Sequence, residues 1–106
     1  MLEKIKLGQI KKHLDASKDE VILTEVFKLL GDKSRYRIVK VLTEEGELCV
    51  SDLAAVLDAS MSAVSQHLRV LEMSGLVEGE RMGQMMCYKP LFNHPKVKAI
   101  IKLMQS

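Results

Sequence analysis

The spacing of apolar residues changes at Gly75, from the interval of a helix to that of a β-strand. In residues 60–73, apolar side chains recur every three or four positions, which predicts an amphipathic helix. In residues 76–81 and 84–89 the pattern has the two-residue period of strands, and Gly83 between them suits a tight turn. The chain is therefore expected to place a β-hairpin directly after a helix.

Short amphipathic segments surround this helix and hairpin. The segment 53–57 is joined to the helix 60–73 by a short turn, which is typical of a helix-turn-helix. A hairpin directly after the second helix is a wing, so we expect a winged helix-turn-helix whose second helix enters the DNA major groove. The fold class is mainly α (α+β), with five or six helices and a two-stranded β-wing. The other expected elements are helices over 3–14, 18–30, 35–42 with Ser34 as its N-cap, and 95–105, and a β-prone run over 48–50.

A length of 106 residues supports a single domain with a small core. We expect residues 1–16 to form a helical N-terminal extension and residues 17–106 to form the domain. No apolar run approaches the ~20 residues of a membrane span, and the N-terminus lacks the apolar core of a signal peptide. Two cysteines are too few for a disulfide framework, so a cytoplasmic protein is expected.

The formal net charge is +2, but charge is strongly segregated along the chain. Residues 1–40 contain ten basic and six acidic side chains, residues 41–80 contain one and eight, and residues 81–106 contain five and none. Segregation of this kind occurs on surfaces that bind polyanions, although charges also collect wherever a surface is solvated. Charge alone therefore makes nucleic acid a candidate partner without favouring it.

The helix 60–73 carries a polar face of unusual composition. Opposite its apolar stripe lie two hydroxyls, an amide, a guanidinium and a thioether: Met61, Ser62, Ser65, Gln66 and Arg69. Gln can pair with adenine and Arg with guanine, and no carboxylate occurs between Asp58 and Glu72 to repel phosphate. An ordinary solvated face is the alternative, but such faces are usually rich in Glu and Lys rather than in Ser, a poor helix former. The pattern favours DNA binding.

The segment Glu47–Tyr88 resembles the ArsR/SmtB family of bacterial and archaeal transcription repressors, above all through AVSQHLRVLE, the following GLV and the pattern R-x-G-x-x-x-x-Y. Upstream, LLGDKSRYRIVKVL is similar to the family's L-x-D-x-x-R-x-x-I-x-x-L segment. The resemblance covers residues 26–104. It implies a homodimer that binds double-stranded DNA at an inverted repeat and blocks transcription until an inducer weakens the binding.

Positions that match the family pattern supply candidate DNA contacts. The candidates for base contacts are Ser62, Ser65 and Gln66, with Met61, Ala63 and His67 beside them. Arg69 is a further candidate, taken from the polar face of the helix and not from the family pattern. The resemblance also implies phosphate sites at the helix N-termini near Ser60 and Ser51, and contacts of the wing residues Arg81 and Gln84 with the flanking minor groove. Further phosphate candidates are Lys33, Arg35 and Arg37. For Arg37, which matches the family's arginine, a structural ion pair with an acidic residue is the alternative. The helices 18–30 and 95–105 are expected to form the dimer interface, because both have wide apolar stripes.

The cysteines raise the question of a sensor site. The family's thiol-rich metal site uses a Cys-x-Cys pair, of which this chain has Cys49 but carries Ser51 at the second position. One thiolate is a poor anchor for a soft metal, and the last helix lacks the second histidine of the family's zinc site, so no metal site is expected. In a winged helix the short first strand often pairs with the last wing strand, which would make Cys49 and Cys87 neighbours. A thiol switch across this pair is one interpretation, and two small buried apolar side chains on adjacent strands is the favoured one.

Two other function classes compete with DNA binding. A winged-helix module that binds protein and no DNA would need an apolar face on the helix 60–73. An enzyme would need a nucleophile–base pair, a glycine-rich phosphate loop or paired carboxylates, and the sequence shows none of these patterns. We therefore expect no catalysis and no cofactor. The sequence identifies neither the operator nor the inducer.

Overall fold

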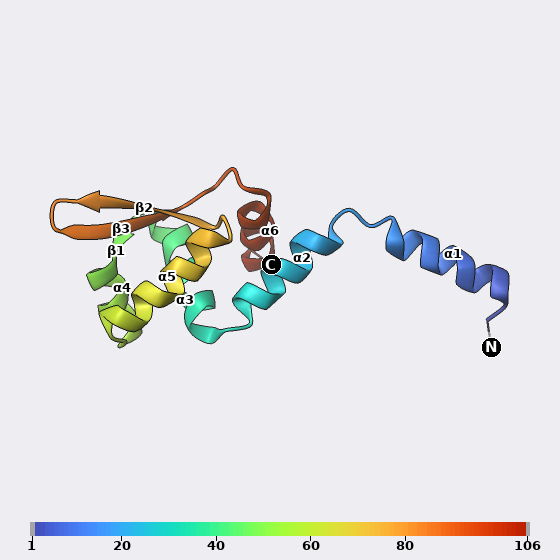
Figure 1. Cartoon of the computed structure of the whole chain (residues 1–106), viewed down its shortest axis with the longest axis horizontal. Coiled ribbons are helices and arrows are strands. Elements are labelled where there is room, and N and C mark those ends of the chain that lie inside the picture. The colour runs from blue at the N-terminus through green and yellow to red at the C-terminus, as the bar shows by residue number, and fades with distance from the viewer. Residues whose placement is uncertain (1, 106) are drawn as a thin grey trace.

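The computed structural model describes residues 2–105; Met1 and Ser106, the outer ends of the expected extension and domain, lie outside this range. Six helices and three strands follow one another in the described residues. Their bounds are α1 Lys4–Asp15, α2 Glu20–Leu30, α3 Lys33–Glu45, β1 Leu48–Cys49, α4 Val50–Leu57, α5 Met61–Met73, β2 Val77–Met82, β3 Met85–Pro90 and α6 Pro95–Met104. The mainly α winged helix-turn-helix is confirmed, with α4 and α5 as its two helices and β2–β3 as its wing (Figure 1).

The wing belongs to a three-stranded antiparallel sheet in the order β1-β3-β2. β2 and β3 form the expected hairpin, and Gly83 in its turn has a φ of 67°. β1 adds two residues on the other side of β3, where Leu48 pairs with Tyr88 and Cys49 pairs with Cys87. The wing is therefore joined through β1 to the start of α4.

The core lies between the helices and the inner face of the sheet. Apolar residues at helical spacing on α3, α5 and α6 are buried because each helix turns its stripe inward. The most deeply buried side chains, each at most 1% exposed, include Val26, Ile38, Leu42, Leu53, Val64, Leu68, Leu71, Leu76, Val97 and Ile100. Lys96 fixes α6 to its neighbours, since its Nζ donates to the carbonyl of Ser74 at 3.0 Å and lies 3.5 Å from Glu25 Oε1 on α2.

We expected Ser34 to cap α3. The residue that caps this helix, at the corner between α2 and α3, is Asp32. Asp32 has an extended backbone, and its Oδ1 accepts a hydrogen bond from the backbone N–H of Arg35 at 3.0 Å. The Nε of Arg35 in turn donates to the carbonyl of Leu29 at 2.8 Å. Asp32 therefore begins α3 two residues earlier than predicted, because Arg35 links the new helix to the end of the preceding one.

Replacing Asp32 by alanine should lower the free energy of unfolding by about 0.5–2 kcal/mol at neutral pH, because α3 loses its cap. The hydrogen bond from the Arg35 backbone holds the pKa of the Asp32 carboxyl below its usual value. A carboxyl with a depressed folded pKa stabilises the fold above its unfolded pKa, and this contribution is lost as the pH falls through the folded pKa. Urea unfolding at neutral and at strongly acidic pH measures both effects.

Asp32→Asn is the matched control, because Asn caps helices about as well as Asp but does not ionise. The stability difference between the wild type and Asp32→Asn should shrink in acid. If both proteins lost the same stability over the same pH interval, Asp32 would not contribute to the acid dependence.

The helix α1 lies apart from the other elements, at one end of an elongated molecule that measures 63 × 25 × 24 Å (Figure 1). None of its residues is buried, and its apolar side chains are exposed, with Ile5 at 75% and Leu14 at 61%. Burial of the apolar side of α1 would therefore require contacts outside this single chain. None of the helices in the described part of the chain has the length and apolar character needed to cross a membrane.

Candidate nucleic-acid interface

The helix α5 separates its residues into two faces. Val64, Leu68 and Leu71 are at most 1% exposed and pack into the core. The sequence-predicted candidates lie on the remaining surface of α5, which we call the strip. Met61, Ser62, Gln66 and Arg69 are exposed, and Ala63, Ser65 and His67 are half-buried. The strip carries hydroxyl, amide and guanidinium groups, which are the groups that can bond to base edges and phosphates.

The N-terminus of α5 is built by Ser60. Its backbone is extended, and its Oγ accepts a hydrogen bond from the backbone N–H of Ala63 at 3.1 Å. The hydroxyl of Ser60 is thus used within the helix. The first-turn N–H groups of Met61 and Ser62 have no carbonyl four residues earlier in the helix to which they could donate. This end of α5 presents backbone donors, where a phosphate oxygen is favoured by the helix dipole.

A tight turn sets the angle between α4 and α5. Asp58 lies in the left-handed region with a φ of 52°, and the backbone N–H of Ala59 donates to the carbonyl of Ala54 at 3.0 Å. Asp is among the few residues other than Gly that adopt this conformation readily. The segment 58–60 therefore turns as predicted. The start of α4 differs, because the helix begins at Val50, before the predicted segment 53–57, and Cys49 is the residue that precedes its first turn.

The wing presents Arg81 and Gln84 near its tip. Both side chains are exposed, and Met82, the last residue of β2, is 50% exposed. The hairpin extends away from α6, with α4 and α5 below it in the view of Figure 1. Arg81 and Gln84 are thus placed on a projecting element beside the two helices, and not on the strip of α5 itself.

A contact that the sequence analysis missed joins the wing to α5. Glu72 Oε2 accepts a hydrogen bond from the backbone N–H of Gly79 at 3.1 Å. Gly79 pairs with Tyr88, and a Cβ at this glycine would lie 2.7 Å from Cε2 of that ring. Burial raises the pKa of the Tyr88 phenol, and the nearby Glu72 carboxylate raises it further. A glycine inside a predicted strand was the available signal, since such glycines mark close approaches.

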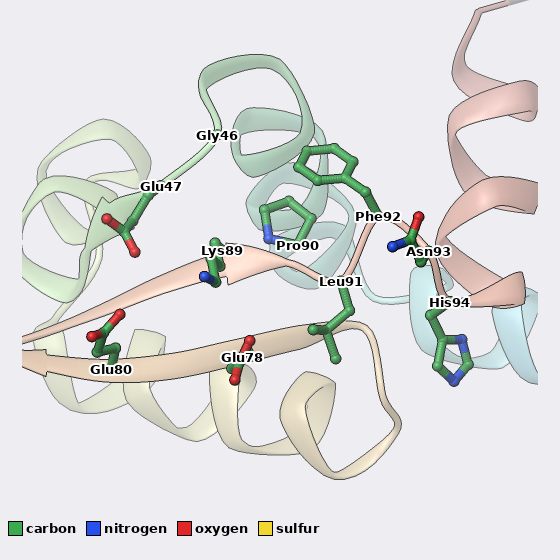
Figure 2. Close-up of a pocket in the computed structure, with 10 residues that line it drawn as sticks. All are labelled: Gly46, Glu47, Glu78, Glu80, Lys89, Pro90, Leu91, Phe92, Asn93 and His94. Atoms are coloured by element: carbon green, nitrogen blue, oxygen red, sulfur yellow. The ribbon is translucent and has the colours of Figure 1, made fainter.

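The acidic residues of the wing lie on the side of the sheet that faces away from the core. Gly79 and Tyr88 face the core, so the alternation of strand residues puts Glu78, Glu80 and Lys89 on the other side. There they line a shallow hollow of about 860 Å³ together with Glu47 (Figure 2). These carboxylates would therefore repel a phosphate on the outer side of the sheet and not on its inner face.

The basic residues near α3 differ in their surroundings. Lys33 and Arg37 are exposed. Arg35 is half-buried, donates to the carbonyl of Leu29 and has its Nη1 3.9 Å from Asp32 Oδ2. Arg35 therefore has a structural role at the corner between α2 and α3, which leaves Lys33 and Arg37 as the more accessible phosphate candidates of this region.

Cys49 and Cys87 are neighbours on β1 and β3, as predicted, and they are joined in a disulfide. The favoured interpretation of two small apolar side chains that merely pack together is therefore wrong, although Cys87 is buried at 1% exposure. Sequence alone could not decide this, because the register of β1 against β3 determines whether the two sulfur atoms meet. Among residues 2–105, no group of three or more His, Cys, Asp or Glu side chains lies close enough together to hold a metal ion.

The helix-turn-helix region matches the family model described as "Bacterial regulatory protein, arsR family" over residues 32–79. The chain is also 36% identical over 91 residues to the "Cadmium resistance transcriptional regulatory protein CadC homolog" of Staphylococcus aureus, a match that covers 86% of this chain and 74% of the relative. This chain belongs to the ArsR family. The resemblance found in the sequence is confirmed. The chain is a DNA-binding transcription regulator and not a module that binds protein alone.

Other comparisons agree with this assignment to the ArsR family. The "Arsenical resistance operon repressor" of Escherichia coli (strain K12) is 43% identical over 65 residues, which cover 61% of this chain and 56% of that protein. The solved structure of HlyU from Vibrio cholerae N16961 matches with a TM-score of 0.71 and 31% identity, covering 84% of this chain and 94% of that one. The AntR antimony-specific transcriptional repressor matches with a TM-score of 0.71 and 29% identity, covering 85% and 79%. The curated relatives are named as regulators, which argues against an enzyme.

Proposed function

We propose that two copies of this chain bind an inverted-repeat operator and repress transcription until an inducer weakens the binding. The observation that carries this proposal is the strip of α5. Its side chains include groups that can bond to base edges, and no carboxylate occurs from Met61 to Leu71. A helix of this kind after a tight turn enters the DNA major groove with its N-terminal residues against the base edges. The relatives that are named as repressors support repression over activation.

The individual contacts follow from the place of each residue. Ser62, Ser65 and Gln66 contact base edges, with Met61, Ala63 and His67 beside them. The backbone N–H groups at the Ser60 end of α5 bind phosphates, and the guanidinium of Arg69 is a further contact to a guanine edge. Arg81 and Gln84 on the wing enter the flanking minor groove, where a narrow groove favours Arg. Because part of the affinity comes from neutralised phosphates, binding should weaken as the salt concentration rises.

A homodimer is supported by apolar surface that the single chain leaves exposed on α2 and α6. Val21 is 77% exposed and Phe27 61% on α2, and Leu103 is 47% exposed on α6. The two helices also border a hollow of about 560 Å³, lined by Ile22 and Leu23 among others. Soluble monomers rarely expose contiguous apolar surface of this kind. In this proposal α2 and α6 form the dimer interface and residues 17–106 the domain, with residues 1–16 as an extension.

The proposed repressor acts on DNA in the cytoplasm and needs neither catalysis nor a cofactor. We assign no metal as inducer, because Ser51 stands where the family's second thiolate would be and Cys49 is bonded to Cys87. The names of the cadmium, arsenic and antimony regulators therefore describe those relatives and identify no inducer for this chain.

Gln66→Ala should weaken binding to the operator about 5- to 150-fold for each half-site, because one bidentate base contact contributes about 1–3 kcal/mol of discrimination. The measurement is fluorescence anisotropy with the DNA upstream of the gene that encodes this chain. Met73→Ala is the matched control, since Met73 lies at the other end of α5 and is 83% exposed. Equal affinities of the wild type and Gln66→Ala would remove Gln66 from the interface, and a wild type without affinity for any DNA would reject the proposed function.

A further inference from the structure

The Cys49–Cys87 disulfide closes a loop that contains every candidate contact of the helix-turn-helix and wing. The two cysteines are separated by 38 residues, and α4, α5, β2 and the wing tip all lie between them. The candidates on α5 and on the wing span residues 60–84. The bond therefore fixes the two ends of the DNA-contacting unit to each other.

Each sulfur atom belongs to a residue that leads directly to an element of this unit. Cys49 immediately precedes α4, and its backbone N–H donates to Asp52 Oδ2 in the first turn of that helix at 3.2 Å. Cys87 precedes Tyr88, which is 8% exposed and pairs with Gly79. Gly79 is hydrogen-bonded to Glu72 near the end of α5. The disulfide is thus connected to α4 on one side and, through the wing, to α5 on the other.

The two cysteines differ in their access to solvent. Cys49 is partly exposed, whereas Cys87 is 1% exposed. Because exchange begins with the attack of a thiolate on one sulfur atom of the disulfide, an external thiol should reach Cys49 first. Cys49 is therefore the side from which the bond is attacked.

This inference rests on the proposed function, since a repressor works in the compartment that holds the DNA. Disulfides are rare in that reducing compartment, and those that occur in mesophiles are usually transient and catalytic or redox-sensing. We propose that Cys49 and Cys87 form a reversible dithiol–disulfide site, whose disulfide holds α4 and the wing in the arrangement that binds the operator. Reduction by small cellular thiols releases this link and weakens operator binding.

The exchange balances with two thiols as the reductant. The thiolate of a first small thiol attacks Sγ of Cys49, forms a mixed disulfide with it and releases Cys87 as a thiolate that takes up a proton. A second small thiol attacks the sulfur of the first, so that Cys49 leaves as a thiolate, also protonated, and a small-molecule disulfide is formed. Two electrons and two protons pass to the protein, and oxidation by a small-molecule disulfide reverses both steps.

The test uses the full chain in buffers that span a wide range of reduced to oxidised glutathione. Alkylation of free thiols followed by mass spectrometry gives the fraction of disulfide without reference to DNA. Anisotropy with the upstream DNA fragment gives the affinity in the same buffers. We expect the pair to convert between its two states within the series, and the reduced form to bind at least about fivefold more weakly, which is the lower end of ordinary couplings between sites.

Two variants distinguish a local effect from general unfolding. Cys49→Ser keeps a residue that suits the start of a helix and should bind like the reduced wild type in every buffer. Cys87→Ala should do the same, and circular dichroism should show reduced wild type and both variants folded at the temperature of the assay. Reduced protein that is unfolded, a pair that does not interconvert, or equal affinity in both states would each overturn the inference. Equal affinity would leave the proposed function intact, whereas a chain that binds DNA in neither state would overturn both.

Discussion

Truncation of Leu68 to alanine should lower the free energy of unfolding by about 2–5 kcal/mol, the usual effect of removing a large apolar side chain from a packed core. Leu68 is 0% exposed and lies in the middle of α5, between Val64 and Leu71 on the same buried face. The loss combines the transfer of fewer apolar atoms out of water with the cavity that remains among its neighbours. Urea unfolding monitored by circular dichroism measures it, at several protein concentrations because a dimer is proposed.

Gln66→Ala is the control on the same helix, two residues earlier and on the exposed face. Its effect on the free energy of unfolding should stay within about 0.5 kcal/mol, as for most surface substitutions away from caps and buried networks. Leu68→Ala would then lose stability, whereas Gln66→Ala would lose operator affinity alone. Equal losses of stability in the two variants would show that the faces of α5 are not divided as the structure has them.

The division of α5 into two faces could be predicted because it follows from local spacing. Apolar residues three and four positions apart share one side of a helix, so Val64 and Leu68 identified the core face and thereby the exposed one. The wing was predictable for the same reason, since a two-residue period around Gly83 has few interpretations. Both features depend on neighbours within a dozen residues, and both were confirmed.

Features that depend on contacts between distant segments were predicted less well. Ser34 is as good a cap as Asp32 by residue type, and the choice depends on Arg35 reaching the carbonyl of Leu29. The bond between Glu72 and Gly79 required the position of the wing over the end of α5. In each case the sequence offers the right residue types, and the tertiary arrangement selects among them.

Reduction of the Cys49–Cys87 disulfide should lower the free energy of unfolding by about 2–4 kcal/mol. The two cysteines are 38 residues apart, so their bond removes much of the freedom of the unfolded chain. The chain-entropy relation gives about 4 kcal/mol for a loop of this length, and measured values are often smaller because reduced chains retain some structure. Urea unfolding of the oxidised protein, with and without a strong reductant, measures the difference.

Cys49→Ser is the control for this experiment, because it has no disulfide to reduce and should unfold at the same urea concentration with and without reductant. The oxidised wild type should be more stable than this variant, and the reduced wild type should approach it. The reduced domain should nevertheless remain folded, since the core formed by residues such as Ile38, Leu68 and Ile100 does not depend on the bond. If the reductant did not change the urea concentration at which the wild type unfolds, the closed loop would not constrain the unfolded chain. The β1–β3 pairing alone would then connect α4 to the wing.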